Sequence, residues 1–180
     1  AESVELTALA QTHGLVTQVG YHYRYVGAFG EIKRLLDAGA IGQVTQVLAE
    51  AYGPVVLKSQ GATWRSKKNL GGGSLYDYAA HPLNLVNWYL GEPTGVAGTV
   101  LQPVFSSEID DQVSATLRFG SGATAQLSVN WSDESERKMS TKMTLWGTKG
   151  RIHADRQEIQ VYLRDGATVP PDYSPGWTVK

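Results

Sequence analysis

Asp77 and His81 lie four residues apart, a spacing that brings two side chains together on one face of a helix. A carboxylate beside an imidazole orients the ring and favours its protonated form, which is the arrangement that a general acid or base requires. The pattern is weak by itself, because most such pairs are surface or capping pairs. The glycine triplet at residues 71–73 directly precedes the pair and lets the backbone turn sharply, which favours the catalytic interpretation.

The apolar periodicity of residues 75–90 predicts the helix that must position this pair, with Ser74 as its N-cap. Because the face that holds the pair carries no Lys or Glu, we expect it to line a cleft rather than to be solvated. Pro82 should bend the helix just after residue 81 and leave the carbonyl of Tyr78 without its usual partner. The cleft face carries Asp77, His81, Asn84 and Trp88, and the core-facing side carries Leu75, Ala79, Leu83, Val86 and Leu90.

Other catalytic chemistries find less support in the sequence. A metal site would need a third ligand beside the pair, and neither His22, His153 nor Asp110 evidently converges on it. The chain has no cysteine and no serine in a G-x-S-x-G turn. The glycine triplet lacks the P-loop lysine and the G-x-G-x-x-G spacing of phosphate-binding loops. We therefore predict acid–base chemistry without a metal.

The composition limits the classes of partner. Sixteen basic and seventeen acidic residues among 180 give a formal net charge of −1, which gives no support to a nucleic-acid or membrane-surface partner. No segment has the pattern of a transmembrane helix or a signal peptide. The lack of cysteine excludes a disulfide framework and fits a cytoplasmic protein. Because the chain starts at Ala1 and not at Met, we expect it to be a piece of a longer protein.

The first twenty residues have the pattern of half an αβ unit. Residues 2–13 have the periodicity of a helix that ends at Gly14, and the Val-rich residues 15–19 form a candidate strand. The sheet partners of this strand are not evident downstream, so we expect them to precede Ala1.

Residues 20–25 are expected to continue that strand into a loop. A second helix over 31–38 and a strand over 44–52 follow. The irregular stretch 53–73 contains Trp64-Arg65, which favours a functional loop. In residues 20–25, aromatic and basic residues alternate. They could form an aromatic cross-strand patch or the wall of a binding pocket. These residues are Tyr21, His22, Tyr23, Arg24 and Tyr25.

The chain after residue 91 reads as β structure, and the sequence predicts an α+β fold: an open, predominantly antiparallel sheet with helices packed on one face. The other face carries short neutral side chains with only Arg118 and Lys142 charged, so we interpret it as an oligomer interface. The Pro-rich residues 165–180 are expected to form an irregular tail. The predicted strands are 96–104, 112–119, 123–131, 139–146, 151–154 and 158–163.

The order of these motifs resembles that of the Gfo/Idh/MocA family of NAD(P)-dependent oxidoreductases, which includes glucose–fructose oxidoreductase and inositol dehydrogenase. The resemblance implies that residues 1–20 are the last helix and strand of a Rossmann domain, and that residues 21–164 form a substrate and oligomerisation domain before the tail. The resemblance extends over nearly the whole chain, and the segments that carry it are VGYHYRY (19–25), LLDAGAIGQV (35–44), Trp64-Arg65, GGGSLYDYAAH (71–81) and WGTKG (146–150).

By the same resemblance, His81 is the acid or base for the substrate hydroxyl or carbonyl, with Asp77 beside it. The implied substrate is a sugar, cyclitol or related polyol, and the implied cofactor is NAD or NADP, bound mainly by a preceding domain. Because the dinucleotide fingerprint and the family's Glu-Lys-Pro segment are absent from the sequence, we expect this fragment to be inactive alone. The alternative is a non-catalytic sugar-binding or assembly module on the same scaffold. The candidate substrate-binding residues are Trp64, Arg65, Asn84 and Tyr21, and the candidate cofactor-binding residues are His22, Arg24 and Arg65.

Overall fold

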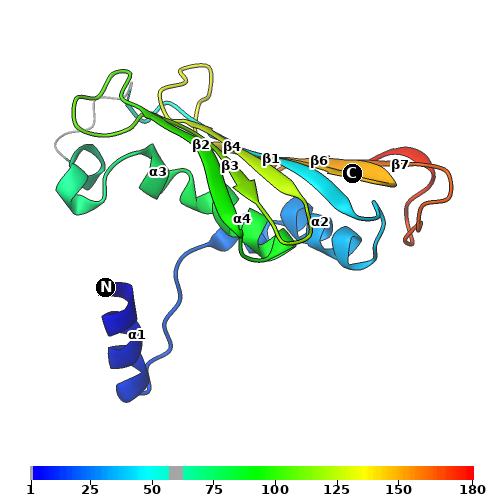
Figure 1. Ribbon diagram of the computed structural model, residues 1–180, viewed down its shortest axis with the longest axis horizontal. Coiled ribbons are helices and arrows are strands. Elements are labelled where there is room, and N and C mark those ends of the chain that lie inside the picture. The colour runs from blue at the N-terminus through cyan, green and yellow to red at the C-terminus, as the bar shows by residue number, and fades with distance from the viewer. Residues whose placement is uncertain (1, 57–62) are drawn as a thin grey trace.

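Eight strands form one open sheet in the computed structural model, which describes residues 2–56 and 63–180 (Figure 1). The strand order is β2-β3-β4-β1-β5-β6-β7-β8, and every neighbouring pair is antiparallel except β1 and β4. The predicted α+β class is therefore confirmed. The strands are β1 (Val44–Tyr52), β2 (Gly95–Gln102), β3 (Gln112–Arg118), β4 (Thr124–Asn130), β5 (Ser140–Gly147), β6 (Gly150–Ala154), β7 (Ile159–Leu163) and β8 (Gly176–Val179).

Three helices cover one side of this sheet, as Figure 1 shows for α2, α3 and α4. The hydrophobic core lies between them and the sheet, because the strands turn their apolar side chains toward the helices. Of the largest fully buried side chains, Phe29 and Ile32 come from α2, Leu85 from α4, and Met143 and Leu145 from β5. The helices are α1 (Glu2–Thr12), α2 (Gly27–Asp37), α3 (Ser74–Asp77) and α4 (Ala80–Leu90), with short 3₁₀ helices η1 (His22–Tyr25), η2 (Trp64–Ser66) and η3 (Lys68–Leu70).

The other side of the sheet is not covered by any helix or strand of the described residues. As predicted, small polar side chains such as Ser114 and Gln126 lie exposed on it. The strands at the β8 end add aromatic side chains that the prediction did not include. The rings of Tyr162 and Trp177 are 5.3 Å apart, and Trp177 is 56% exposed. This open face thus combines short polar side chains with an exposed aromatic cluster.

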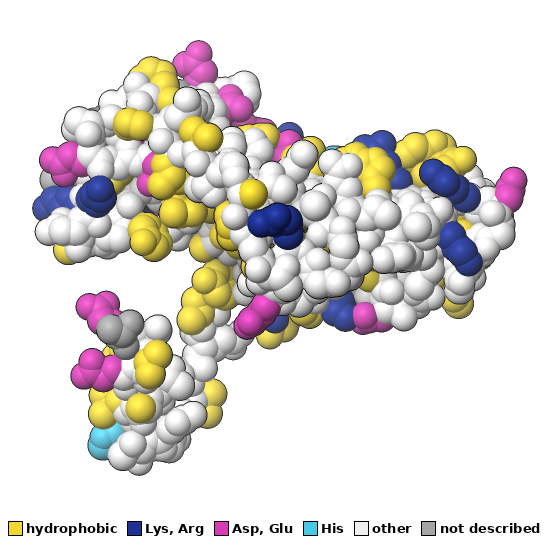
Figure 2. Space-filling model, viewed as in Figure 1, with side chains coloured by type: hydrophobic (Ala, Val, Ile, Leu, Met, Phe, Trp, Pro, Cys, Tyr) yellow, Lys and Arg dark blue, Asp and Glu magenta, His cyan; other side chains and the backbone are white. Residues whose placement is uncertain are grey.

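The N-terminal segment lies apart from the sheet in Figure 1, and its apolar side chains are exposed (Figure 2). Leu6 and Leu9 of α1 are 65% and 54% exposed, and Val16 is fully exposed. Residues 15–19, predicted as a strand with partners before Ala1, form no strand here, and the described part of the chain offers them no strand to pair with. Residues 22–25 do not continue it, but form the 3₁₀ helix η1.

The predicted single helix over 75–90 is two helices, α3 and α4, separated at Tyr78 and Ala79. Pro82 does not cause the break, because it lies in the first turn of α4, where its missing N–H is not needed. As predicted, the carbonyl of Tyr78 lacks its usual partner four residues on, because Pro82 has no N–H; it accepts a hydrogen bond from the N–H of His81 at 3.3 Å instead. Ser74 is not the N-cap, which is Gly73.

The break also changes which side chains are buried. Leu75, Leu83 and Leu90 are only partly buried, whereas Pro82 and Leu85 join the fully buried set. The half-buried side chains include Asp77, His81, Asn84 and Trp88.

Two further boundaries differ from the sequence prediction. Helix α2 begins at Gly27, four residues before the predicted start at 31. The predicted irregular tail is wrong for Gly176–Val179, which form β8 and pair with β7. Among the described residues, no helix has the length and apolar character needed to cross a bilayer.

Candidate active site

His81 lies in the first turn of α4, against the aromatic residues of η1 and the residue before it. The centroid of its ring is 5.1 Å from that of Tyr23, 5.8 Å from that of His22 and 6.2 Å from that of Tyr21. Tyr23 is buried, Tyr21 is half-buried and His22 is exposed. Of the two interpretations left open by the sequence, a cross-strand patch is therefore wrong, and the segment forms a wall beside His81.

The surroundings of His81 favour the neutral imidazole. Burial lowers its pKa below the ordinary value, the neighbouring His22 lowers it further, and Asp77 opposes both effects without reversing them. Asp77 thus favours the protonated ring, as expected from the sequence, but burial and His22 outweigh its effect. The Nδ1 atom of His81 is buried and has no hydrogen-bond partner among the described residues. Such an atom carries a free-energy cost that a hydrogen-bonding ligand would relieve.

Asp77, the last residue of α3, pairs with Arg65 rather than with His81. The Nε atom of Arg65 donates a hydrogen bond of 2.8 Å to Oδ2 of Asp77. The guanidinium of Arg65 also lies over the ring of Trp64, with its Cζ atom 4.9 Å from the ring centroid. The predicted contact between Asp77 and His81 is thus replaced by an electrostatic influence of the carboxylate on the imidazole.

The glycine triplet explains how the Trp64-Arg65 loop reaches α3. A side chain at Gly72 would collide with the carbonyl groups of residues 64 and 65, and the N–H of Gly73 donates to the Arg65 carbonyl at 3.2 Å. Gly73 has φ of 114°, and a Cβ atom there would lie 2.5 Å from the carboxylate of Asp110. Close backbone approach and a backbone conformation that L side chains rarely adopt therefore require glycine at these positions.

Arg24 and Asn84 form a third group with Trp88 on the same side of α4. The Nε atom of Arg24 donates to Oδ1 of Asn84 at 2.8 Å, and its Cζ atom lies 5.5 Å from the centroid of the Trp88 ring. Arg24, a candidate cofactor ligand, and Asn84, a candidate substrate ligand, thus contact each other. The four polar residues of the predicted cleft face are divided among three side-chain groups.

Two adjacent aspartates, Asp110 and Asp111, hold backbone segments next to the site through hydrogen bonds. Oδ2 of Asp110 accepts hydrogen bonds of 2.7 Å from the Ser74 hydroxyl and from the N–H of Leu75, and so caps α3. Asp111 is fully buried and accepts hydrogen bonds from the N–H groups of residues 104–106, the Ser106 hydroxyl and the Trp131 indole. Burial by itself would raise the pKa of Asp111, but these hydrogen bonds outweigh it and lower the pKa below its ordinary value. No group of three potential metal ligands occurs in the described ranges.

Two residues near His81 were not among the predicted site residues. Tyr23 is the ring nearest to His81, and the Cζ atom of Arg156 lies 5.6 Å from the centroid of that tyrosine. The tyrosine alternation was a usable signal for the first, but nothing in the sequence connects η1 with the β6–β7 turn that carries Arg156.

Comparison with known proteins shows what the chain is similar to. Residues 29–153 match the family model described as the GFO/IDH/MocA C-terminal domain. A dTDP-3,4-didehydro-2,6-dideoxy-alpha-D-glucose 3-reductase of Streptomyces violaceoruber is 31% identical over 157 residues, which are 87% of this chain and 44% of that protein. The chain thus spans about half the length of the curated relatives that it matches.

Solved structures share the fold. Levoglucosan dehydrogenase in complex with NADH matches 92% of this chain and 47% of its own, with a TM-score of 0.80 and 22% identity. The WlbA dehydrogenase of Bordetella pertussis, in complex with NADH and UDP-GlcNAcA, matches 83% of this chain and 43% of its own, with a TM-score of 0.74 and 20% identity.

Proposed function

The chain belongs to the Gfo/Idh/MocA family, and we propose that it is the substrate-binding and oligomerisation domain of an NAD(P)-dependent oxidoreductase that acts on a sugar, cyclitol or related polyol. The resemblance seen in the motif order is confirmed by the family match. The Streptomyces relative is named for a nucleotide-linked sugar, which supports a sugar-like substrate here. The proposal is carried by the surroundings of His81. This half-buried histidine has a lowered pKa and a buried Nδ1 atom without a hydrogen-bond partner among the described residues, and the carboxylate of the Arg65–Asp77 pair acts on it electrostatically.

The residues around His81 fit a nicotinamide cofactor and a polyol. His22 is exposed, and the Arg65 side chain keeps 38% of its surface exposed while it holds Asp77, so both can contact a ligand. We assign His22, Arg24 and Arg65 to the cofactor and Trp64, Arg65, Asn84 and Tyr21 to the substrate. A nicotinamide held there would supply the hydride acceptor or donor, and the chain's own residues would transfer the proton.

His81 removes the hydroxyl proton when the substrate is oxidised and returns it when a carbonyl is reduced. A neutral imidazole is the form that accepts a proton, and the lowered pKa provides that form at neutral pH. Asp77 favours the imidazolium that results, since its negative charge raises the pKa of His81. The Arg65 pair fixes the orientation of that carboxylate.

The N-terminal segment and the open face support the two other parts of the proposal. The exposed apolar side chains of α1 suit a helix that packs against a dinucleotide-binding domain, as expected for residues 1–20. Since that domain would bind most of the cofactor, the 180-residue chain alone should not turn over substrate. The open sheet face, with Tyr162 and Trp177 exposed, suits a second copy of the chain.

The test is steady-state kinetics of the full-length gene product with a panel of polyols and both cofactors. His81→Ala should lower kcat by about 10²–10⁴-fold, because it removes the acid–base group. His13→Gln, an exposed histidine at the end of α1, is the matched control and should keep its activity. Near-normal turnover by His81→Ala would exclude the proposed role, and binding of polyols without any dinucleotide-dependent turnover would indicate the non-catalytic module.

A further inference from the structure

His81 must pass on the proton that it takes from a substrate hydroxyl before it can act again. The imidazole is half-buried, and the part of it that solvent reaches is also the part that a substrate can contact. A bound substrate and nicotinamide therefore cover the direct path from His81 to water. A neighbouring group that contacts both His81 and solvent would supply another path.

His22 is a group of this kind. Its side chain is exposed, and its ring lies 5.8 Å from that of His81 between centroids, with the two ring planes at 65°. Tyr21 and Tyr23 also border His81, but a phenol, whose pKa is ordinarily about 10, keeps its proton at neutral pH. An imidazole both accepts and releases protons there. Of these three neighbours, His22 is therefore the one suited to proton transfer.

Both imidazole rings have a nitrogen atom available for a further hydrogen bond. Nδ1 of His81 is buried and has no partner in the described part of the chain. Nδ1 of His22 lies 3.4 Å from the carbonyl oxygen of Gly20, which favours the tautomer protonated at Nδ1 and leaves Nε2 as the acceptor. One water between the rings, or a small rotation of the exposed His22 ring, would complete a hydrogen-bonded path.

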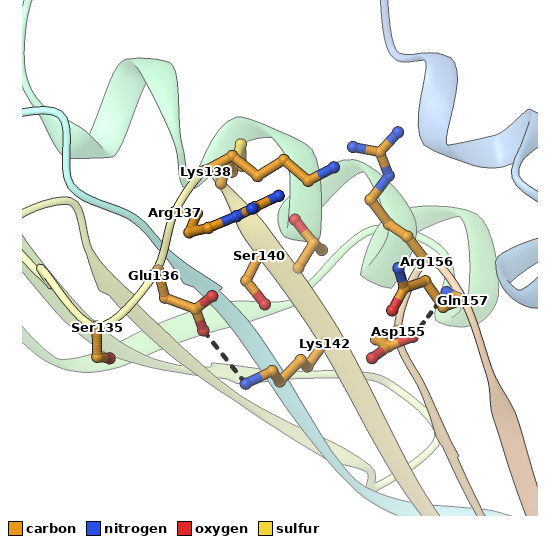
Figure 3. Close-up of a pocket in the computed structure, with 11 residues that line it drawn as sticks. Ser135, Glu136, Arg137, Lys138, Ser140, Lys142, Asp155, Arg156 and Gln157 are labelled. Atoms are coloured by element: carbon orange, nitrogen blue, oxygen red, sulfur yellow. Dashed lines mark hydrogen bonds and ion pairs between the residues drawn. The ribbon is translucent and has the colours of Figure 1, made fainter.

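The cavity drawn in Figure 3 does not offer a competing path. It has a volume of about 570 Å³, and its described lining includes Arg156 but neither His22 nor His81. Figure 3 shows the Arg156 side chain extending from the β6–β7 turn, and its Cζ atom lies 5.6 Å from the centroid of the Tyr23 ring. The titratable and charged side chains around the two imidazoles are Tyr21, Tyr23 and Arg24 in and before η1, Arg65 of η2, Asp77 of α3, and Arg156.

We propose that His22 relays the proton between His81 and solvent. During oxidation the hydride leaves the substrate carbon for the nicotinamide with the electron pair of the C–H bond, and the hydroxyl proton binds to one nitrogen of His81. The other nitrogen of His81 then gives a proton to Nε2 of His22, which releases one to water. Both rings end neutral, and one proton is released for each hydride transferred. Reduction of a carbonyl uses the same steps in reverse.

This inference rests on the proposed function and adds a route for the proton to it. The experiment is a single turnover of the full-length protein with the polyol that the kinetic panel identifies, in which a pH-indicator dye reports proton release and the absorbance of the reduced nicotinamide reports hydride transfer. In His22→Ala, proton release should be slower by roughly tenfold or more, and added imidazole should restore it. His22→Gln, which keeps an amide but cannot relay, should show the same defect. His13→Gln is the control and should match the wild type.

A second measurement needs no substrate. In the unliganded protein, an NMR titration of His22→Gln should show a raised pKa of His81, because His22 lowers that pKa in the wild type. The inference is overturned if this pKa is unchanged, if proton release in His22→Ala is as fast as in the wild type, or if imidazole does not restore it. A higher KM for the cofactor with normal proton release would leave His22 as a cofactor ligand only.

The failure of this inference is distinct from that of the proposed function. Loss of turnover in His81→Ala with normal proton release in His22→Ala would refute only the relay. Near-normal turnover in His81→Ala would refute the acid–base role itself.

Discussion

Asp111 should be among the most sensitive positions of the domain, although it lies outside the proposed active site. Its side chain is fully buried and accepts five hydrogen bonds, three from the backbone of residues 104–106, one from Ser106 and one from the Trp131 indole. In Asp111→Ala these donors lose their acceptor inside the protein. At about 1–3 kcal/mol for each donor that stays buried, with some reached by water, we expect the free energy of unfolding to fall by about 3–5 kcal/mol.

Such a loss is a large share of the roughly 5–15 kcal/mol that stabilises a typical domain. The assay is urea unfolding followed by tryptophan fluorescence, with Asp165→Ala, an exposed aspartate, as the control. A loss below about 1 kcal/mol would refute the reasoning, because the buried donors would then have found other partners.

The pH dependence of stability gives the same prediction a second readout. The folded-state pKa of Asp111 lies below its ordinary value of 3.8, so its ionised form stabilises the fold at pH values above 3.8. That stabilisation is lost as the pH falls toward the folded-state pKa. The wild type should therefore lose stability more steeply below pH 3.8 than Asp111→Ala does. Parallel curves for the two proteins would contradict the lowered pKa.

Three further perturbations test other parts of the structure. Gly73→Ala places a Cβ atom at a φ of 114° and against the Asp110 carboxylate, so it should lower the free energy of unfolding by about 2–3 kcal/mol. Gly98 also has a positive φ but lies in open space, so Gly98→Ala should lower the free energy of unfolding by only about 1 kcal/mol. In the wild type the Asp77 carboxylate raises the pKa of His81, so Asp77→Asn should lower that pKa further. An NMR titration of the imidazole measures it, and an unchanged or raised pKa would contradict the prediction. Trp177→Ser should lower the mass of the full-length protein measured by light scattering at low concentration. Val169→Ser, which changes an exposed apolar residue outside the strands, should leave the mass unchanged. An unchanged mass for Trp177→Ser would count against the open face as the interface.

The sequence predicted the sheet well because its strands alternate clearly between apolar and polar residues. Strand β1 has the predicted bounds of 44–52, and β3 and β4 differ by a residue at their ends. β8 could not be found in this way, since four residues at the edge of a sheet are too few to show a period. Conversely, residues 15–19 have the composition of a strand, but a strand also needs a neighbour for its hydrogen bonds.

The site was predicted in its residues but only partly in its contacts. Helical spacing placed Asp77 and His81 on one face, whereas the structure ends α3 at Asp77 and begins α4 at Ala80, so the two side chains belong to different helices. Asp77 instead meets Arg65, because the glycine triplet brings the 64–66 loop onto α3. Such contacts depend on how segments distant in the sequence pack together, and the hydrophobic periodicity of a single segment carries no information about that.

The most direct test of the account is the pH dependence of kcat/KM for polyol oxidation by the full-length protein. If neutral His81 is the base, kcat/KM should be constant at neutral pH and fall in acid with an apparent pKa below the ordinary histidine value of 6.5. His81→Ala should lose both the high rate and this ionisation. An acid limb that stays unchanged in His81→Ala, or one with a pKa above 6.5 in the wild type, would contradict the central claim.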